Sequence, residues 1–485
     1  MLQEISDRLQ KGRIDRASFR DPSGFVFYQN AEVFRQVNHV YKEHYDHYIA
    51  SGLRERLEKE SLVIPFREIG QTFGPLENAY KILQPEKIQF ISYPYEWCFS
   101  QLKDAALVTL NIQRIAIDFG MTLKDASAFN IQFVDGKPTH IDTLSFEKYE
   151  AGTPWIAYRQ FCQHFLAPLS LTAYRDPRLN RLLRGYIDGT PLDLASVLLP
   201  KRTWLKLGLA LHIHLHGISQ KRLMKEAIRN NRRESDFRGV SMHALVDSLT
   251  RTVSTLRWES NGDNWTKYYS EDSPDHGYLR HKAKVVGEYL DLIAPKSVWD
   301  IGSNTGFFSR MAARQGIKTY SLDADISCVE QNYRQCKKEA EKNLLPLWLD
   351  FANPSPSIGW DLQERRSILN RGLPDTVFAL GLIHHLSIAG NVPLDSLAMF
   401  FSRICRFLII EFVPKNDPRV QQMLALRKDL FAFYNQERFE SDFGRFFHTI
   451  GRTPCLNSSR TLYLMNNRSV ELPGRMSSMR SVSCA

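Results

Sequence analysis

From residue 297 onward, short apolar runs alternate with longer amphipathic stretches. Runs of this length predict buried strands, and the apolar spacing of three and four residues between them predicts helices. Alternation of strand and helix favours a mostly parallel sheet with helices on both faces, an α/β, doubly wound, Rossmann-like architecture. The expected strands are Ser297–Ile301, Thr319–Leu322, Leu345–Leu349, Thr376–Leu382 and Phe407–Phe412.

The first 220 residues follow a different pattern. Apolar residues alternate with period two over 24–27 and 32–37, which predicts a hairpin. From 154 to 217 the pattern is helical and is interrupted by prolines. A small sheet followed by helices predicts an α+β domain. The other expected elements are a helix over 38–60, strands over 79–83 and 87–92, and a long helix over 99–119.

These patterns divide the chain, which at 485 residues is too long for one ordinary core. We expect an N-terminal α+β domain over 1–220 and a second domain over 263–470. Between them, 221–262 is rich in arginine and lysine at its start and is predicted to be a basic linker. Residues 471–485 are expected to form a flexible tail.

The composition is that of an ordinary globular protein, with 43% hydrophobic and 24% charged residues. The net charge of +10 favours anionic partners in general, yet no basic run is interleaved with aromatic residues, so nucleic-acid binding is not predicted. The amino terminus carries acids where a signal peptide has basic residues, and no membrane-spanning apolar run occurs. Seven cysteines without a CxxC pair are typical of reduced thiols, so a cytoplasmic location is expected. The sequence gives no indication of the oligomeric state.

Candidate chemistry gathers at the carboxyl ends of the expected strands, where ligands bind in open α/β sheets. The first strand runs into Asp300, Gly302, Asn304 and Gly306, a tight loop before a helix whose backbone N–H groups can face a nucleotide-like ligand. Asp323 ends the second strand, where an acid accepts hydrogen bonds from ribose hydroxyls. A nicotinamide-binding domain would carry GxGxxG, which the spacing of Gly302 and Gly306 does not match. The sequence therefore predicts a nucleoside cofactor site.

With Asp350 at the end of the third strand, the pattern is similar to that of class I S-adenosylmethionine-dependent methyltransferases over about residues 265–466. The resemblance implies S-adenosylmethionine as the cofactor. It places Asp323 on the ribose hydroxyls, Asp350 beside the adenine amino group and Phe351 against the ring. Asp300 is expected to orient the loop or the cofactor ammonium.

The same resemblance implies a terminal antiparallel pair of strands, over 445–450 and 461–466. The longer patterns Ile301–Gly306 and Leu382–Leu386 resemble a bacterial group related to rhizobial host-specificity nodulation proteins. The expected activity is methylation of a small-molecule or glycan-type acceptor, at a hydroxyl or an amine.

Methyl transfer from a sulfonium is an in-line displacement, so the protein has to align the acceptor and exclude water. The acceptor also loses a proton, and a histidine that titrates near neutrality suits that role. His384 and His385 follow the fourth strand, so one of them is the candidate base, and Glu411 at the end of the fifth strand is a second candidate. A histidine that only packs against or caps the following helix is an equal alternative.

A second group of polar residues lies in the N-terminal domain. Asp125 is followed five residues later by Asn130 and, after a short hairpin, by Asp142, which places three oxygen ligands around one site. The pattern resembles the catalytic and metal-binding loops of the protein-kinase-like fold, including aminoglycoside kinases. The resemblance implies Asp125 as the catalytic base and Asn130 and Asp142 as Mg²⁺ ligands, with ATP as a second cofactor.

The chain departs from that kinase-like pattern at several points. The residues before Asp125 and after Asp142 differ from the family's, no glycine-rich phosphate loop is evident, and Arg35 is the nearest substitute for the phosphate-binding lysine. Two alternatives stay open: turns capped by Asp and Asn, and a module that only binds the substrate or a partner. His212 and His216 share a helix face but have no evident third ligand, so no metal site is predicted there.

Overall fold

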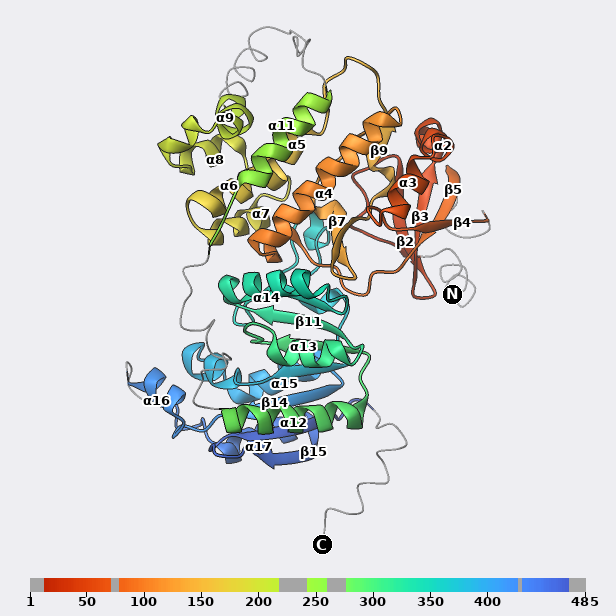
Figure 1. Ribbon diagram of the computed structural model, residues 1–485. Helices are drawn as coiled ribbons and strands as arrows, with labels where there is room; N and C mark the ends of the chain where they lie inside the picture. Colours follow the sequence, from red (N-terminus) through yellow and green to blue (C-terminus); the bar gives the residue numbers. More distant parts are fainter. Residues whose placement is uncertain (1–12, 71–77, 218–241, 260–275, 426–429, 471–485) are drawn as a thin grey trace. The chain divides into compact units, whose positions relative to one another are not determined.

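The computed structural model describes residues 13–70, 78–217, 242–259, 276–425 and 430–470 (Figure 1). The chain forms two compact units. The first unit holds residues 1–259 together with 356–367, and the second holds 260–355 together with 368–485. Each unit has its own core and is described by itself.

The first unit begins with a five-stranded antiparallel sheet in the order β1-β2-β3-β5-β4. The predicted hairpin is confirmed, because β2 and β3 pair from Gly24–Val37 to Gln29–Glu32. Phe27, Phe34 and Ile82 fill the core of this sheet. The strands are β1 (Arg13–Ile14), β2 (Gly24–Gln29), β3 (Glu32–Asn38), β4 (Phe66–Ile69) and β5 (Ala79–Pro85).

Helices form most of the rest of the first unit. The predicted helix over 38–60 is divided at Gly52, whose φ of 82° ends one helix and begins the next. The long predicted helix is confirmed as α4, and α11 packs against it (Figure 1). The helices are α2 (Lys42–Ala50), α3 (Leu53–Lys59), α4 (Phe99–Asp118), α5 (Tyr158–Phe161), α6 (Ala167–Tyr174), α7 (Leu182–Gly185), α8 (Leu192–Leu198), α9 (Leu207–Leu209) and α11 (Met242–Thr255).

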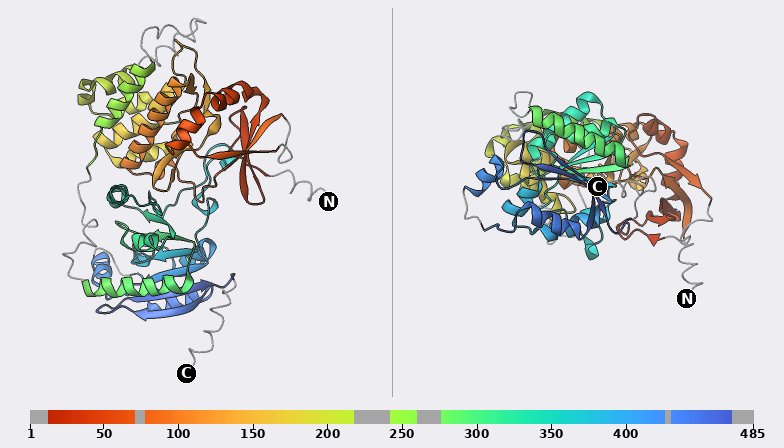
Figure 2. Two further views of the ribbon diagram at one scale, coloured as in Figure 1. Left: turned by 45° about the vertical axis from the view of Figure 1, so that its right-hand side comes forward. Right: turned by 90° about the horizontal axis from the view of Figure 1, so that it is seen from below.

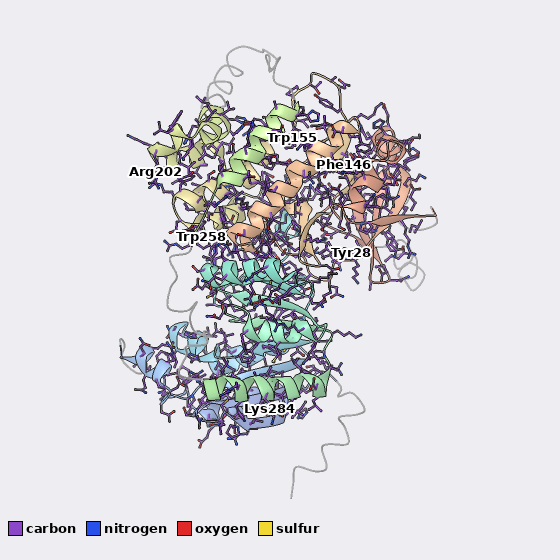
Figure 3. The ribbon with its side chains drawn as sticks, in the orientation of Figure 1. Tyr28, Phe146, Trp155, Arg202, Trp258 and Lys284 are labelled. Atoms are coloured by element: carbon purple, nitrogen blue, oxygen red, sulfur yellow. The ribbon has the colours of Figure 1, made fainter. Side chains whose placement is uncertain are left out.

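Two short strand pairs follow α4 and hold the loops that carry polar residues. The first pair is β6 (Met121–Leu123) with β9 (Phe146–Lys148), and the second is β7 (Ile131–Val134) with β8 (Lys137–His140). Trp155 donates its indole N–H to the carbonyl of Leu123 at 2.8 Å, and Phe146 stacks on Tyr48 with ring centroids 5.0 Å apart. Figure 3 labels Trp155 and Phe146. Leu123 and Phe146 are paired with each other at one end of β6–β9, so both contacts fix that end of the pair in the core.

The first unit differs from the sequence-based expectation in two places. The predicted strand over 87–92 is wrong, because both backbone groups of Ser92 bond to the side-chain amide of Gln132, at 2.9 and 2.8 Å, in place of a neighbouring strand. Part of the predicted linker is α11, whose buried Met242, Val246, Leu249 and Val253 form one helix face. The rest of 221–262 and the tail 471–485 lie outside the described residues, apart from 256–259.

The second unit is a seven-stranded sheet in the order β12-β11-β10-β13-β14-β16-β15. The first five strands in this order are parallel, and β16 and β15 are antiparallel, so the expected terminal antiparallel pair is present. β13 ends three residues before its predicted end, since Gly381 takes a φ of 70°. The strands are β10 (Ser297–Ile301), β11 (Lys318–Asp323), β12 (Leu344–Trp348), β13 (Thr376–Ala379), β14 (Phe407–Phe412), β15 (Phe447–Pro454) and β16 (Thr461–Asn467).

Helices cover both faces of this sheet, as predicted. α12 and α13 pack on the face that carries Phe407 and Ile409 of β14. On the opposite face, Phe412 contacts Phe439 of α17, with ring centroids 5.1 Å apart. Figure 2 shows α12 lying along the sheet. The helices are α12 (His276–Ile293), α13 (Phe307–Arg314), α14 (Ile326–Glu339), α15 (Leu394–Ile404), α16 (Pro418–Leu424) and α17 (Gln436–Gly444).

Residues 356–367, here called the inserted segment, leave the second unit after β12 and pack within the first unit before the chain returns to β13. Arg20 holds Glu364 of this segment through two hydrogen bonds of 2.5 and 3.1 Å. The guanidinium of Arg365 lies 4.2 Å from the ring centroid of Phe129, and Tyr93 accepts the backbone N–H of Arg366 at 2.7 Å. The first unit is therefore completed by residues from the second half of the chain.

Candidate functional site

The predicted glycine loop joins β10 to α13. Gly302, Asn304 and Gly306 all have positive φ, of 75°, 53° and 82°, which glycine and asparagine adopt at the least cost. The loop is tied to the second strand by the N–H of Asn304, which donates to a carboxylate oxygen of Asp323 at 2.7 Å. The structure therefore brings these four predicted residues together.

Asp323 lies half-buried at the end of β11. Its other oxygen accepts the N–H of Asp325 at 2.8 Å. Burial raises the pKa of Asp323 to about 6 in spite of these backbone hydrogen bonds. Because each carboxylate oxygen has two lone pairs, Asp323 can still accept hydrogen bonds from a pair of hydroxyl groups.

Asp300 anchors the loop from below. Its carboxylate is buried and accepts the hydroxyl of Ser309, in α13, at 2.6 Å. Burial raises the pKa of Asp300 to about 7. Asp300 was expected to orient either the loop or the cofactor ammonium. Its hydrogen bond to Ser309 is consistent with orientation of the loop.

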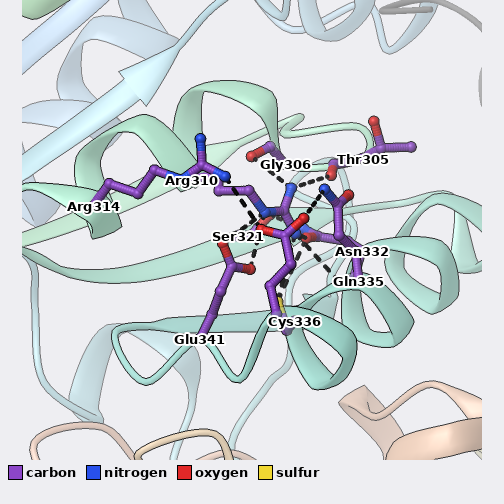
Figure 4. A network of polar contacts seen from close by, with 10 residues as sticks. Thr305, Gly306, Arg310, Arg314, Ser321, Asn332, Gln335, Cys336 and Glu341 are labelled. Atoms are coloured by element: carbon purple, nitrogen blue, oxygen red, sulfur yellow. Dashed lines mark hydrogen bonds and ion pairs between the residues drawn. The ribbon is translucent and has the colours of Figure 1, made fainter.

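A buried arginine behind the loop was not predicted. Arg310 of α13 donates to the carbonyls of Thr305 and Gly306, at 3.1 and 3.4 Å, and to the side chain of Asn332 at 2.7 Å (Figure 4). Its charge is balanced by Glu341, whose oxygens lie 2.8 and 2.9 Å from Nε. A Cβ at Gly306 would lie 2.4 Å from Asn332, so only glycine fits against this support.

Asp350 and Phe351 follow β12, as predicted. Asp350 accepts the N–H of Ala352 at 2.9 Å, which fixes the turn at this strand end. The half-buried ring of Phe351 contacts Trp299 and Phe400 edge-on, with centroids 6.5 and 6.2 Å apart. These contacts hold Asp350 and Phe351 in place just after the end of β12.

Glu411 is fully buried in β14 and is already paired. Tyr278 donates its hydroxyl to one oxygen, Lys282 lies 2.7 Å from the other, and Gly381 leaves room beside it. Arg460 lies 4.0 Å from Glu411 and binds Asp417 through bonds of 2.7 and 3.2 Å. We call Tyr278, Lys282, Glu411, Asp417 and Arg460 the Glu411 network.

The charges of this network determine what Glu411 can do. Burial alone would raise the pKa of Glu411, but Lys282 and Arg460 outweigh it and the pKa is lowered. A carboxylate held ionised between two cations is a counter-ion, and it is poorly suited to accept a proton. The prediction of Glu411 as a second base therefore has no support in its contacts.

The two histidines lie after β13. His384 is 3% exposed, and its Nδ1 has no hydrogen-bond partner among the described residues. Burial lowers the pKa of His384 well below its usual value, and His385, Arg460 and Lys282 lower it further. The pKa of the half-buried His385 is lowered as well, chiefly by burial. Both imidazoles are therefore neutral near pH 7, and the large lowering of the pKa of His384 makes its ring a weak base.

In the first unit, the three predicted residues also lie together. Asn130 donates to the hydroxyl of Ser145 at 3.2 Å, and that hydroxyl donates to Asp142 at 2.6 Å. Asp142 forms an ion pair with Arg35 of β3, which lowers the pKa of Asp142 although burial opposes it. Burial and the nearby Asp142 raise the pKa of Asp125.

A cavity of about 700 Å³ lies beside Asp125 in the first unit. Gln160 connects the two, because it lines the cavity and its side chain accepts the N–H of Ala126 at 2.7 Å. Lys124, Gln163, Tyr186 and Asp188 also line it, so the walls are mixed polar and aromatic.

His212, which was considered as a metal ligand, is hydrogen-bonded to other side chains. His212 bonds to Tyr158 and Ser248, at 2.7 and 2.9 Å. Within the described ranges, no three His, Cys, Asp or Glu side chains gather as a metal site, and no helix is long and apolar enough to cross a membrane. The six cysteines of these ranges are buried, and no disulfide joins any two of them.

No family model matches the chain. The nodulation protein NoeA of Rhizobium meliloti (strain 1021) is 33% identical over 462 residues, which cover 93% of this chain and 95% of NoeA. Among solved structures, the N-methyltransferase NodS from Bradyrhizobium japonicum WM9 matches at 13% identity over 43% of this chain and 94% of NodS, with a TM-score of 0.31. The bifunctional kinase-methyltransferase WbdD matches at 16% identity over 38% of this chain, with a TM-score of 0.29, and the match spans 39% of WbdD.

Proposed function

The chain belongs to the family of the nodulation protein NoeA, and we propose that it is an S-adenosylmethionine-dependent methyltransferase acting on a small-molecule or glycan-type acceptor. The proposal rests on one observation above the others. The hydrogen bond from the Asn304 N–H to Asp323, 2.7 Å long, holds the glycine loop against the acid at the next strand end. Loop and acid together form a surface that a nucleoside with free ribose hydroxyls can occupy.

The residues at three neighbouring strand ends fit the cofactor. Gly302 and Gly306 carry no side chain where the backbone has to approach a ligand. Asp323 is the acceptor for ribose hydroxyls, and Asp350 and Phe351 provide a polar and an aromatic contact for adenine. The cofactor supplies an electrophilic methyl group on a sulfonium, and the protein has to orient the acceptor, exclude water and take up a proton.

His384 and His385 are the residues we assign to the proton. Both follow β13, next to the glycine loop in the sheet order, because β13 pairs with β10. Their lowered pKa values keep both imidazoles neutral, and the pKa of His385 is lowered less than that of His384, so His385 is the stronger base of the two. Glu411 keeps a different role in this proposal, as the ionised partner of Lys282.

Calorimetric titration of the full chain with S-adenosylhomocysteine tests the cofactor site. Asp323→Ala should weaken binding about tenfold to a hundredfold, the range expected for a lost charge-assisted hydrogen bond of roughly 1.5–3 kcal/mol. Asp323→Asn keeps an oxygen for the Asn304 N–H and should lose less. Asp291→Ala, at an exposed acid of α12, is the control. Unaltered binding in Asp323→Ala would remove the site assignment.

A second candidate function belongs to the first unit, as a kinase-like phosphotransferase that uses Mg²⁺ and ATP. It is favoured by the grouping of Asp125, Asn130 and Asp142 around Ser145, with Arg35 as the cation on β3. The ion pair between Arg35 and Asp142 occupies one proposed metal ligand, so a nucleotide would have to draw Arg35 toward its phosphates. The remaining alternative is that the unit only binds the substrate or a partner, with the cavity beside Asp125 as its site.

Thermal unfolding of the full chain separates these alternatives. A phosphotransferase should gain stability from millimolar Mg·ATP, because a ligand that binds only the folded state raises its melting temperature. Asp142→Asn should abolish the gain, and Asp135→Asn, in the exposed turn between β7 and β8, should keep it. The absence of any shift in the unaltered chain would leave only the binding module.

A further inference from the structure

A helical segment of the first unit carries apolar side chains on the face that it turns to solvent. α9 continues directly as the π-helix Ala210–Leu215. Its buried side carries Leu209 and Ile213. Three leucines recur every four residues on the exposed side, and they are 84%, 47% and 50% exposed: Leu207, Leu211 and Leu215. A helix with one buried apolar face normally carries polar residues on the other, so this segment departs from the usual pattern.

The turn before α9 adds to this apolar surface. The 3₁₀ helix Lys201–Leu205 ends in Trp204 and Leu205, which are 42% and 88% exposed. Figure 1 shows α8 and α9, which flank this turn in the chain, at one edge of the first unit. Five large apolar side chains are thus exposed within one short stretch of the chain. We call them the leucine patch: Trp204, Leu205, Leu207, Leu211 and Leu215.

Buried polar contacts fix the leucine patch to the rest of the unit. The hydroxyl of Thr203 donates to the carbonyl of Pro200 at 2.7 Å and lies 2.9 Å from Nε2 of His214. The other ring nitrogen of His214 bonds to Ser196 of α8 at 2.7 Å, and the indole of Trp204 stacks on the same ring with centroids 4.4 Å apart. The turn, the π-helix and α8 are therefore joined, and turning the patch inward would break these contacts.

Cations are interleaved with the leucine patch. Lys201, Arg202 and Lys206 are all exposed, and none of the three forms an ion pair with a residue that the structure describes. Figure 3 labels Arg202, at the same edge of the first unit as α8 and α9. No aspartate or glutamate occurs from residue 194 to residue 217. The patch therefore combines apolar side chains with positive charge that no acid of this stretch balances.

This combination matches the surface of an anionic lipid bilayer. A bilayer accepts protruding leucines at its acyl boundary whatever their shape, while lysine and arginine stay at the level of the phosphates. Tryptophan is enriched at the same depth. The negative potential of anionic lipids attracts the cations. A second copy of the chain, seated on the patch about a two-fold axis, would instead bring like charges together.

We propose that the leucine patch docks the first unit on the surface of an anionic lipid bilayer. The leucines and Trp204 enter the acyl boundary, and Lys201, Arg202 and Lys206 contact lipid phosphates. The attachment is peripheral, because it needs no helix that crosses the bilayer. It does not depend on the methyltransferase function proposed for the second unit.

Flotation of the full chain with lipid vesicles tests the docking. Vesicles of phosphatidylcholine alone are compared with vesicles that also contain phosphatidylglycerol. We expect binding to the mixed vesicles to be stronger by about tenfold or more, since each basic residue near an anionic surface contributes about fivefold. Added salt should weaken this binding, because it screens exposed charges. Equal binding to the two kinds of vesicle would overturn the choice of an anionic surface.

Variants at exposed positions separate the patch from the rest of the surface. Leu205→Ser combined with Leu207→Ser removes the two most exposed leucines of the patch and should weaken binding to the mixed vesicles about tenfold or more. Val40→Ser combined with Trp360→Ser changes apolar residues that are 71% and 75% exposed outside the patch. This control should bind as the unaltered chain does.

Three other results would each overturn the proposal. The first is that the unaltered chain binds neither kind of vesicle. The second is that binding survives in the variant with serine at 205 and 207, because it would then come from basic residues elsewhere, such as the run over 221–238. The third is a dimer in sedimentation velocity that the same variant loses, without any vesicle binding, which would assign the patch to a second copy of the chain.

Discussion

Arg310 and Asn332 form a buried hydrogen bond, 2.7 Å from Nη2 to Oδ1, that lies directly behind the glycine loop. Asn332 packs against Gly306, and Arg310 donates to the carbonyl of the same glycine. Helices α13 and α14 are thus joined at the point where the loop turns. The conformation of the loop is therefore held on one side by the hydrogen bond from Asn304 to Asp323 and on the other side by Arg310 and Asn332.

Arg310 supports the glycine loop, so its replacement should weaken binding of the proposed cofactor indirectly, through the position of the loop. Arg310→Gln removes the donor to two loop carbonyls, and the affinity for S-adenosylhomocysteine should fall about tenfold, since hydrogen bonds to charged groups are worth roughly 1.5–3 kcal/mol each. Arg314→Gln, one turn further along α13 in an exposed pair with Glu339, should change it less than about twofold. Equal effects of the two variants in calorimetry would mean that Arg310 does not position the loop.

Glu411 offers a prediction about stability. Glu411→Gln should leave Lys282 buried without its counter-ion and destabilise the second unit by about 3–5 kcal/mol, as breaking buried ion pairs does. Glu288→Gln breaks the exposed pair with Lys284 and should cost less than about 1 kcal/mol. Denaturant unfolding followed by circular dichroism measures both. If the Glu411→Gln protein is as stable as the control, the buried Lys282 does not depend on Glu411 as its counter-ion.

The strand-end residues could be predicted because each belongs to a local pattern. Asp300 and Asp323 follow buried apolar runs, and parallel strands place such ends at one edge of the sheet. The Glu411 network has no local pattern. Tyr278 and Arg460 are 182 residues apart and meet only because antiparallel β16, which follows Arg460, lies beside β14.

The wrong strand over 87–92 and the inserted segment have similar causes. The apolar alternation of 87–92 is that of a strand, but Gln132, 40 residues from Ser92, takes the backbone groups that a neighbouring strand would need. The sequence of residues 356–367 does not indicate that this segment packs in the first unit, because the partner of Glu364 is Arg20, 344 residues away. Contacts made by side chains across such separations are set by tertiary packing, and no sequence window contains them.

The inserted segment should be necessary for the stability of the first unit. The side chain of Glu364 is 1% exposed, whereas that of Arg20 is half-exposed. Arg20→Ala therefore removes two hydrogen bonds to a buried carboxylate, beside which Arg365 remains as a cation, and should destabilise the unit by about 3 kcal/mol. Arg16→Ala breaks the exposed pair with Asp361 and should cost less than about 1 kcal/mol. Thermal unfolding measures both, and similar melting temperatures would show that the segment is only loosely attached.

Buried histidines should make the first unit sensitive to acid. Burial lowers the pKa of His140 and His212 to about 4 and that of His164 to about 3. The unfolded chain, with histidine pKa values near 6.5, then binds more protons than the folded chain between pH 6.5 and 4, so stability should fall as the pH falls through this range. Above pH 6.5 this contribution is constant.

His140 is the best position to test this acid sensitivity, because neither of its ring nitrogens has a hydrogen-bond partner among the described residues and Phe146 packs beside it. His140→Phe keeps the packing and removes the titrating group. Denaturant midpoints between pH 7 and 4 should fall less steeply in this variant, by up to about 3 kcal/mol over the whole range. His39→Phe, at an exposed position, should keep the slope of the unaltered chain. If His140→Phe keeps that slope too, the acid sensitivity arises from other titrating groups. Asp142 and Arg35 are the charged residues that act on the pKa of His140.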